Sequence, residues 1–322
     1  MAAPGAPALL LALTAALGGD VLVPRPCAAW WAPYARLLGR PVFHVPTAAE
    51  CGGVPDPYAL LETVRRVRAE GGDPRLLVLS VADDPTATVA PPELLHETVE
   101  AATGEGLHLV SDETWRDTLH AAHDTVLLSP AEMLHDRVTV VTDLAGALLP
   151  PGWPAAVARF PEGAAGDGLH ARVLDVLTAL DARVAGPVAA AAAYALDEPE
   201  PLGRHVDAVV RLHARVAGAA HHAVVAAGAL CPPPQAAGTS TSTWARCGPG
   251  SPPTACRTRR SWRTSSPPGS ACPHPAATAS ATTWTRCASG CPPARCWAAP
   301  TPNARSAWTH PRRWSCRPWP VR

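Results

Sequence analysis

Short apolar segments alternate with longer segments of helical periodicity over about the first half of the chain, and this alternation constrains the fold more than any other feature. The short segments are apolar throughout rather than at every second position, which is typical of strands covered on both faces. Such strands occur in parallel sheets that lie between helices. We therefore predict an α/β fold with a mostly parallel sheet covered by helices. The expected strands are 21–23, 42–45, 76–80, 107–111, 138–142 and 155–160, and the clearest helices are 56–69 and 92–103.

Residues suited to helix ends lie where this pattern needs them. Asp56 followed by Pro57 predicts a helix start, because the carboxylate accepts from free backbone N–H groups and proline fits the first turn. Gly39, Gly104 and Gly106 are placed to end helices before the next strand.

The first 19 residues, MAAPGAPALLLALTAALGG, contain an apolar run of the kind that a secretory signal also has. No basic residue precedes the run and a strand is expected directly after it, so we interpret it as a buried helix. A membrane-spanning helix needs about 20 consecutive apolar residues, and no run in the sequence is that long. We predict a soluble cytoplasmic protein without a membrane partner.

The composition changes near residue 235. Beyond it the 322-residue chain has no acidic residue, and that part holds seven of the ten cysteines and seven of the eleven tryptophans. We predict three parts: an α/β large domain over 1–160, a helical continuation over 161–235, and a low-complexity tail over 236–322 that has too few aliphatic residues to form a core.

The tail admits three interpretations. Its arginines could neutralise nucleic-acid phosphates, but we consider a nucleic-acid partner unlikely in a chain whose formal net charge is zero. Cys287, Cys291 and Cys296 could bind zinc, but their spacing lacks a second cysteine pair, so we expect no metal site. We favour the third interpretation, in which the tail is encoded by a GC-rich gene that is read out of frame. Sequencing across codons 234–240 would test it.

Three segments contain the ends of expected strands, at the sheet edge where open parallel sheets bind their ligands: LLVLSVADDPTATV, HLVSDETWRD and VTVVTDLAGALLPPGWPAAVARFP. In this order and spacing they resemble the class I/II aminotransferases of the fold-type-I pyridoxal-phosphate group. That family has an Asn-Pro-x-Gly turn, then Ser-Asp-Glu-x-Tyr, then Ser-x-Ser-Lys followed by Gly-x-Arg. The resemblance covers residues 5 to about 160. It implies amino-group transfer between an amino acid and a 2-oxo acid, pyridoxal 5'-phosphate as cofactor, and a homodimer.

The resemblance assigns cofactor contacts to three residues. Asp112 matches the aspartate that bonds the pyridine nitrogen of the cofactor and keeps it protonated. Asp84 stands where the family has an asparagine that donates to the phenolic oxygen, and a carboxylate cannot donate unless it is protonated. Trp115 replaces a tyrosine that reaches the same oxygen. Trp30 and Trp31 lie near the position of a ring-stacking aromatic, and we interpret them as core or surface residues.

The expected phosphate site is altered as well. Asp143 takes the place of a serine that donates to the phosphate, and Pro154 takes the place of the arginine in Gly-x-Arg. A dianion would therefore meet an added carboxylate and lose a bidentate partner. The glycine-rich turn that holds the phosphate corresponds to the region of Gly5, and we expect the large domain to be N-terminally truncated.

Gly146 occupies the position of the lysine that forms the Schiff base with the cofactor. The sequence contains no lysine at all, and arginine is too weak a nucleophile to replace one. We therefore predict no catalytic residue and a protein that resembles an aminotransferase but is catalytically inactive. The alternative is a non-catalytic protein that binds pyridoxal phosphate or an amino acid and has a regulatory role.

Overall fold

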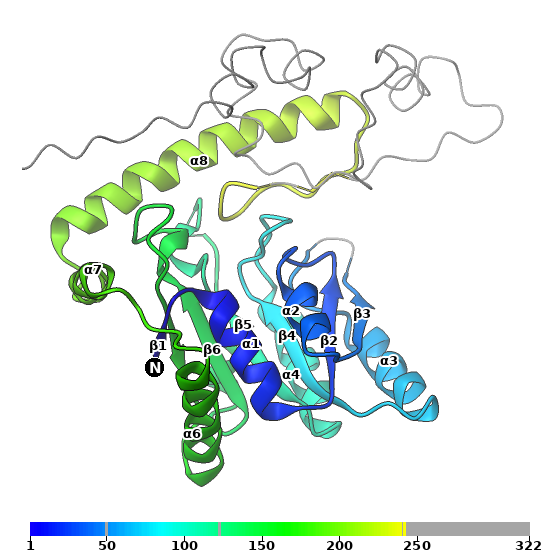
Figure 1. Ribbon diagram of the computed structural model, residues 1–322. Coiled ribbons are helices and arrows are strands. Elements are labelled where there is room, and N and C mark those ends of the chain that lie inside the picture. Colours follow the sequence, from blue (N-terminus) through cyan, green and yellow to red (C-terminus); the bar gives the residue numbers. More distant parts are fainter. Residues whose placement is uncertain (49–50, 122–123, 240, 243–322) are drawn as a thin grey trace, which may run out of the picture.

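The computed structural model describes residues 1–48, 51–121, 124–239 and 241–242. Within them, seven strands form one sheet in the order β1-β7-β6-β5-β4-β2-β3 (Figure 1). Strands β2 to β6 are parallel, and β7 is antiparallel to both of its neighbours. The predicted mostly parallel sheet is confirmed. The strands are β1 Ala2–Ala3, β2 Asp20–Arg25, β3 Val42–Pro46, β4 Pro74–Ser80, β5 His108–Asp112, β6 Val138–Asp143 and β7 Ala156–Arg159.

Helices cover both faces of this sheet. Helices α1 and α6 pack together over one face, and α3 and α4 pack together over the other (Figure 1). The helices are α1 Ala6–Leu17, α2 Trp31–Leu37, α3 Pro57–Ala69, α4 Pro92–Gly104, α5 Pro130–Met133, α6 Ala164–Ala179, α7 Gly186–Leu196 and α8 Glu200–Ala226, with the 3-10 turns η1 Arg116–Thr118 and η2 Leu144–Gly146. The helix predicted at 56–69 and the one at 92–103 are confirmed to within one residue at each end.

Strand β4 shows why the central strands are apolar throughout. Leu76 and Val78 point into the core beneath α1, whereas Leu77 and Leu79 point into the core beneath α3 and α4. All four side chains are at most 1% exposed. Because each fully buried aliphatic side chain stabilises a fold by roughly 1.5–3 kcal/mol, both faces of this strand contribute to stability.

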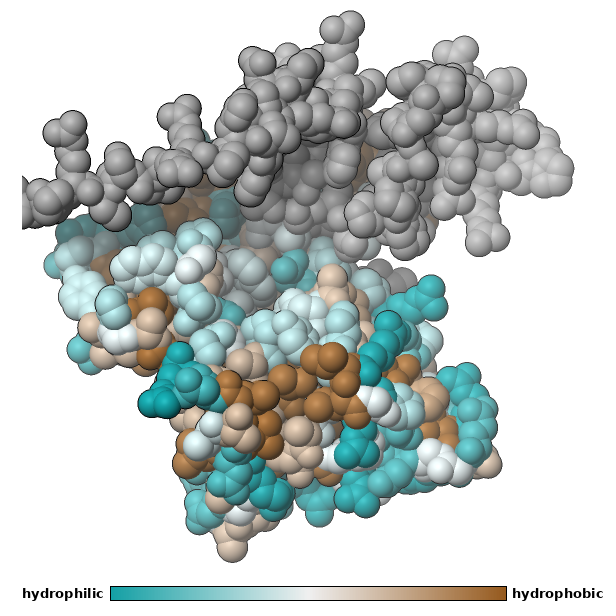
Figure 2. Space-filling model, viewed as in Figure 1, coloured by the Kyte–Doolittle hydropathy of each residue, from teal (hydrophilic) through white to brown (hydrophobic). Residues whose placement is uncertain are grey.

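Helix α1 confirms that the first apolar run is a buried helix. Its Leu9, Leu10 and Leu13 lie in the core. The opposite side of α1 is also apolar but only half-buried, and Figure 2 shows apolar side chains gathered over this helix. Among the residues that the structure describes, no helix combines the length and apolarity that a membrane span needs.

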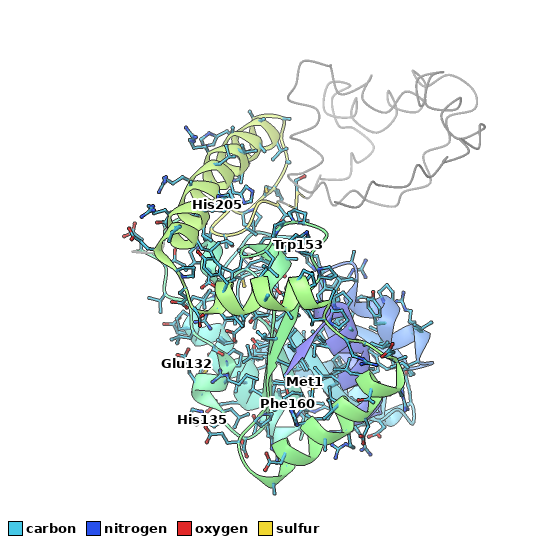
Figure 3. The ribbon with its side chains drawn as sticks, turned by 60° about the vertical axis from the view of Figure 1, so that its left-hand side comes forward. Met1, Glu132, His135, Trp153, Phe160 and His205 are labelled. Atoms are coloured by element: carbon cyan, nitrogen blue, oxygen red, sulfur yellow. The ribbon has the colours of Figure 1, made fainter. Side chains whose placement is uncertain are left out.

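The short strand β1 brings the start of the chain to residues far along the sequence. The backbone N–H of Ala158 donates to Met1 O at 2.8 Å, and the Met1 amino group donates to Ala158 O at 2.9 Å. Met1 and Phe160 lie close together on this side of the sheet (Figure 3). Strand β1 is not among the predicted strands, because two residues are too few to show a pattern.

Residues 232–239, which we call the strap, return from α8 to the carboxyl edge of the sheet. The backbone of Gln235 donates to Ala87 O at 2.6 Å and accepts from His120 N at 2.8 Å. Ala236 and Ala237 are fully buried, so the packed part of the chain extends past the predicted boundary at 235. Residues 240 and 243–322 of the predicted tail lie outside the described residues, including the candidate zinc ligands Cys287, Cys291 and Cys296.

Candidate active site

The carboxyl ends of β4, β5 and β6 bring the predicted residues to one edge of the sheet. Asp84 follows β4, Asp112 ends β5 and Asp143 ends β6. The loop after β5 joins the last two, because the backbone N–H of Asp143 donates to Thr114 Oγ1 at 3.0 Å. A parallel sheet thus gathers side chains that are far apart in the sequence.

Asp112 is buried and both of its oxygens accept hydrogen bonds. Oδ1 accepts from Thr114 N at 3.1 Å, and Oδ2 accepts from Trp31 Nε1 at 3.3 Å. Trp31 opens α2 and is 1% exposed, so of the two interpretations, core or surface, the structure shows a core aromatic. Burial raises the pKa of Asp112 to about 6, although the hydrogen bonds from Thr114 and Trp31 oppose this shift.

Asp143 holds the N-termini of two elements at once. Its Oδ2 accepts from Ala6 N, the first residue of α1, at 2.8 Å. Its Oδ1 accepts from Ala145 N in η2 at 2.9 Å. A negative charge at a helix N-terminus is favourable, because the first N–H groups there have no partner within the helix.

The three residues assigned to the phosphate site meet at this point. A Cβ built on Gly5 would lie 3.5 Å from Asp143 Oδ2 and 3.8 Å from Pro154 Cβ. Gly5 has a φ of 97°, a left-handed conformation that glycine adopts readily. The structure therefore places Gly5, Asp143 and Pro154 together. The Asp143 carboxylate lies against the backbone N–H of Ala6 at the start of α1.

Gly146 lies in η2 beside the loop that follows β5. A Cβ built on it would lie 2.6 Å from Thr114 Cγ2, 3.3 Å from Thr114 O and 3.8 Å from the ring of Trp115. The Thr114 hydroxyl is held by the backbone of Asp143, so its methyl group cannot turn away freely. Any side chain at position 146 would require this loop to shift.

The turn after β4 contains a buried carboxyl that was not among the predicted site residues. Asp83 is fully buried, and its Oδ2 accepts from Thr86 N at 3.2 Å and from Thr86 Oγ1 at 2.5 Å. Burial raises the pKa of Asp83 to about 7, opposed by the Thr86 hydrogen bonds, with smaller contributions from Asp84 and Asp112. Asp84 is half-buried, and burial raises its pKa too. A Thr three residues after an Asp was the available sequence signal.

Glu113 is a second buried carboxylate that sequence reasoning did not single out. It is fully buried and accepts from Arg116 Nη1 at 2.6 Å, from Ser111 Oγ at 3.1 Å and from the Ser129 hydroxyl. These partners compensate the buried charge and fix the loop that carries Asp112 and Thr114.

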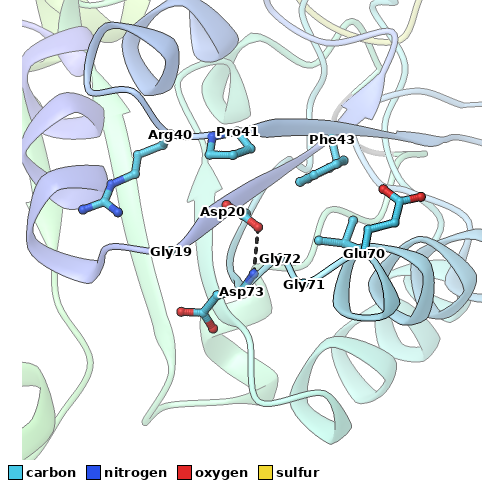
Figure 4. Close-up of a pocket in the computed structure, with 10 residues that line it drawn as sticks. Gly19, Asp20, Arg40, Pro41, Phe43, Glu70, Gly71, Gly72 and Asp73 are labelled. Carbon is cyan, nitrogen blue, oxygen red and sulfur yellow. Dashed lines mark hydrogen bonds between the residues drawn. The ribbon is translucent and has the colours of Figure 1, made fainter.

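Two surface hollows lie at the opposite, amino edge of the sheet. The first, of about 440 Å³, is lined by Asp20, Arg40 and Asp73 among others, and Asp73 N donates to Asp20 Oδ2 at 2.8 Å (Figure 4). The second, of about 460 Å³, is lined by residues that include His108 and Arg137. No predicted site residue lines either hollow, so the candidate site is elsewhere.

The chain matches known proteins in both sequence and structure. The family model described as aminotransferase class I and II matches residues 1–244. A probable aspartate/prephenate aminotransferase of Thermus aquaticus is 32% identical over 149 residues, which are 45% of this chain and 36% of the relative. An aspartate/prephenate aminotransferase of Thermus thermophilus is 31% identical over 148 residues, 45% of this chain and 35% of the relative. The matched segment thus covers about a third of these relatives' length.

Solved structures share the fold. The aspartate aminotransferase of Thermus thermophilus with maleate superposes with a TM-score of 0.62 at 22% identity, over 74% of this chain and 59% of that chain. An aromatic aminotransferase from Pyrococcus horikoshii gives a TM-score of 0.61 at 20% identity, over 74% of this chain and 61% of that chain. With the sheet order, the gathered residues and a family match over most of its length, the chain belongs to the class I and II aminotransferase family.

Proposed function

We propose that this chain is a non-transaminating member of its family. The observation that carries the proposal is Gly146, which has no side chain and no space for one beside Thr114. Class I and II aminotransferases use pyridoxal 5'-phosphate, which acts as an electron sink and is held by a lysine. The resemblance assigns that lysine to position 146, which is glycine here, and the sequence contains no lysine elsewhere to supply the amine.

The residues present do not fit this cofactor. Beyond the missing lysine, the carboxylate of Asp143 already accepts from the α1 N-terminus, which is where an anionic group would bind. Asp84 offers a carboxyl where a donor to the phenolic oxygen is needed. The amino-acid and 2-oxo-acid substrates of the family are therefore ancestral to this chain rather than its present substrates.

The test is a transamination assay on the full chain with pyridoxal 5'-phosphate, aspartate and 2-oxoglutarate, since aspartate is named in the matched relatives. We expect a rate equal to that of free cofactor, and no borohydride-trapped adduct on peptides from the β6–η2 region. Peptide mapping separates such an adduct from one on the α-amino group. Turnover by the parent that is lost in the Asp112→Asn variant would overturn the proposal. The substitution would not affect a contaminating enzyme, so such a loss would show that the activity belongs to this chain.

We also propose that the chain forms a homodimer through α1. The half-buried side of this helix carries Ala8, Leu11 and Ala15, and a helix that is apolar all round is ordinarily buried. Sedimentation equilibrium should show a dimer that Leu11→Gln weakens, whereas Leu174→Gln, at an exposed position on α6, leaves it intact. A single monomeric mass at all concentrations would contradict this.

The cytoplasmic location stays a prediction from the sequence.

A further inference from the structure

We propose that His120 is a pH-sensitive latch, whose protonated imidazole donates to two carbonyl groups of the strap and holds the strap against the carboxyl edge of the sheet. In Figure 1 the strap is the yellow segment that returns beneath α8 toward this edge. The inference concerns the opening and closing of the chain itself and does not depend on the proposed loss of transamination.

Both ring nitrogens of His120 face backbone carbonyl oxygens of the strap. Nδ1 lies 3.2 Å from Pro234 O, and Nε2 lies 2.8 Å from Ala237 O. A carbonyl oxygen can only accept, and a neutral imidazole has a single N–H to donate. Neutral His120 therefore satisfies one oxygen and sets a nitrogen lone pair against the other, whereas the imidazolium donates to both. The arrangement suits the charged form.

Other bonds hold the strap at this place and do not titrate. Gln235 N and Ala236 N donate to Ala87 O at 2.6 and 3.1 Å. The side chain of Gln235 accepts from Val89 N at 3.0 Å, and its backbone oxygen accepts from His120 N at 2.8 Å. Because these bonds form in either charge state of the imidazole, protonation of His120 tightens a strap that is already closed.

The closed strap covers part of the candidate site. Ala236 is fully buried and packs with Ala82 and Val89 in one apolar cluster. Those two residues pair with each other on either side of the turn that carries Asp84, and Trp115 packs against the same cluster. Lifting the strap would expose this turn and the Trp115 ring to solvent. The latch thus controls how readily the carboxyl edge of the sheet opens.

Other ionisable groups near His120 affect the latch. His213 of α8 lies close enough for the two charges to interact, since burial lowers the pKa of His213 and His120 lowers it further. His213 therefore loses its proton at lower pH than an ordinary histidine and leaves the charge to His120. The strap has no ionisable side chain. Among the described residues, the charged side chains on the turn after β4 and on the loop that carries His120 are Asp83, Asp84, Glu113, Arg116, Asp117 and Asp124.

Hydrogen exchange followed by NMR measures the latch directly, because the amides of 235–237, Val89 and His120 all donate within the closed strap. Histidine ordinarily changes its charge between pH 5 and pH 8. Protection factors of these amides in the full chain should be roughly tenfold higher at pH 5 than at pH 8, since a charge-assisted bond is lost as the pH rises. Amides of β4 provide the reference for changes in global stability, to which Asp83 contributes.

Three variants separate the latch from simple loosening of the strap. His120→Gln keeps a side-chain N–H donor without a charge, so its strap amides should have equal protection at both pH values, close to that of the parent at pH 8. Gln235→Ala removes a bond that does not titrate, so it should lower the protection of 236–237 by the same factor at both pH values. His135→Gln, at an exposed position, is the matched control for the loss of a histidine and should behave as the parent.

Two results would overturn the inference: equal protection of the parent's strap amides at pH 5 and pH 8, or a His120→Gln variant that keeps the pH dependence of the parent. A measurement on the parent alone covers the case in which this variant does not fold. Imidazole ¹⁵N signals show when His120 loses its proton, and the loss of strap protection should be complete once His120 is neutral. Loss of protection only at higher pH would assign the effect to another group and would also overturn the inference.

Discussion

Asp83 shows how a single buried carboxyl affects the stability of this chain. Its Oδ1 has no hydrogen-bond partner within the described residues, and burial raises its pKa from 3.8 to about 7. The folded state therefore binds this proton more tightly than the unfolded state between these two pH values, and the free energy of unfolding falls as the pH rises through that window. His108 acts in the opposite direction, because burial lowers its pKa to about 4.

Replacing Asp83 by Asn should therefore stabilise the chain at pH 8 more than at pH 5. The part of the shift that lies between pH 5 and pH 8 corresponds to at most about 3 kcal/mol, because the carboxyl of the unfolded chain is already ionised at pH 5. Urea unfolding followed by circular dichroism at both pH values, with variant and parent compared, removes the contribution of His108. Asp136→Asn, at an exposed position, is the matched charge control. Equal differences at pH 5 and pH 8 would contradict the prediction.

Gly146 provides a steric prediction at the same scale. Gly146→Ala should lower the free energy of unfolding by roughly 1–3 kcal/mol, because the new methyl group would overlap Thr114 Cγ2. Thr114→Ser removes that methyl and keeps the hydroxyl, so the double variant should recover most of the loss.

Gly104→Ala is the control for this measurement, since nothing lies within 4 Å of a Cβ on Gly104. A double-mutant cycle by urea unfolding measures the coupling between positions 146 and 114. Additive effects of the two substitutions would show that the overlap is absent.

The sequence predicted which residues gather at the site but not how they bond. Asp112 and Asp143 end strands, and Asp84, Trp115 and Gly146 follow them; parallel strands bring their carboxyl ends together. The bonds of Trp31 to Asp112 and of Ala6 to Asp143 cross 81 and 137 residues. Such bonds depend on side-chain rotamers and on the spacing between packed elements, and neither is encoded in a local pattern.

At the scale of elements, strands and helices with strong local signals were predictable and short ones were not. The predicted strand at 76–80 lies within β4, because its residues are buried on both faces and read as a continuous apolar run. Helix α5 has four residues and β1 has two, too few for any periodicity. No local pattern in its sequence indicates that β7 is antiparallel, because strand direction is set by the connection and by pairing with β6.

The N-terminus of α3 tests one of the local signals. Asp56 Oδ1 accepts from Ala59 N at 2.9 Å, which confirms the predicted cap. Asp56→Ala should lower the free energy of unfolding by about 1 kcal/mol, because that N–H would lose its partner. Asp56→Asn keeps an acceptor, so it should lower the free energy of unfolding by only a few tenths of a kcal/mol. Thermal unfolding of both variants makes the comparison, and equal losses would exclude capping as the cause.

At the scale of the whole molecule, burial is distributed unevenly. The sheet and its covering helices contain the two large apolar clusters, whereas α8, with 27 residues, has Ala217 as its single buried residue among those described. Leu212 on this helix is 50% exposed. Elements with few buried contacts open at lower free energy than the core.

Hydrogen exchange followed by mass spectrometry should therefore divide the chain into two classes. We expect amides of α8 to exchange faster than those of β4 and β5, with α6, which buries four residues, closer to the sheet. Helix α6 is the internal control, because it is also a long helix but is packed on α1. Equal protection of α8 and β4 would mean that α8 is covered by an additional contact.

The bond between Asp143 and the first turn of α1 has a consequence for how the chain responds to its surroundings. An anion that arrives by diffusion stabilises a fold only to the extent that its concentration exceeds its dissociation constant. A carboxylate that belongs to the same polypeptide is present from synthesis onward and at a fixed distance. On the proposed function, the folded fraction of this chain is independent of the concentration of pyridoxal 5'-phosphate, because its own carboxylate already caps α1.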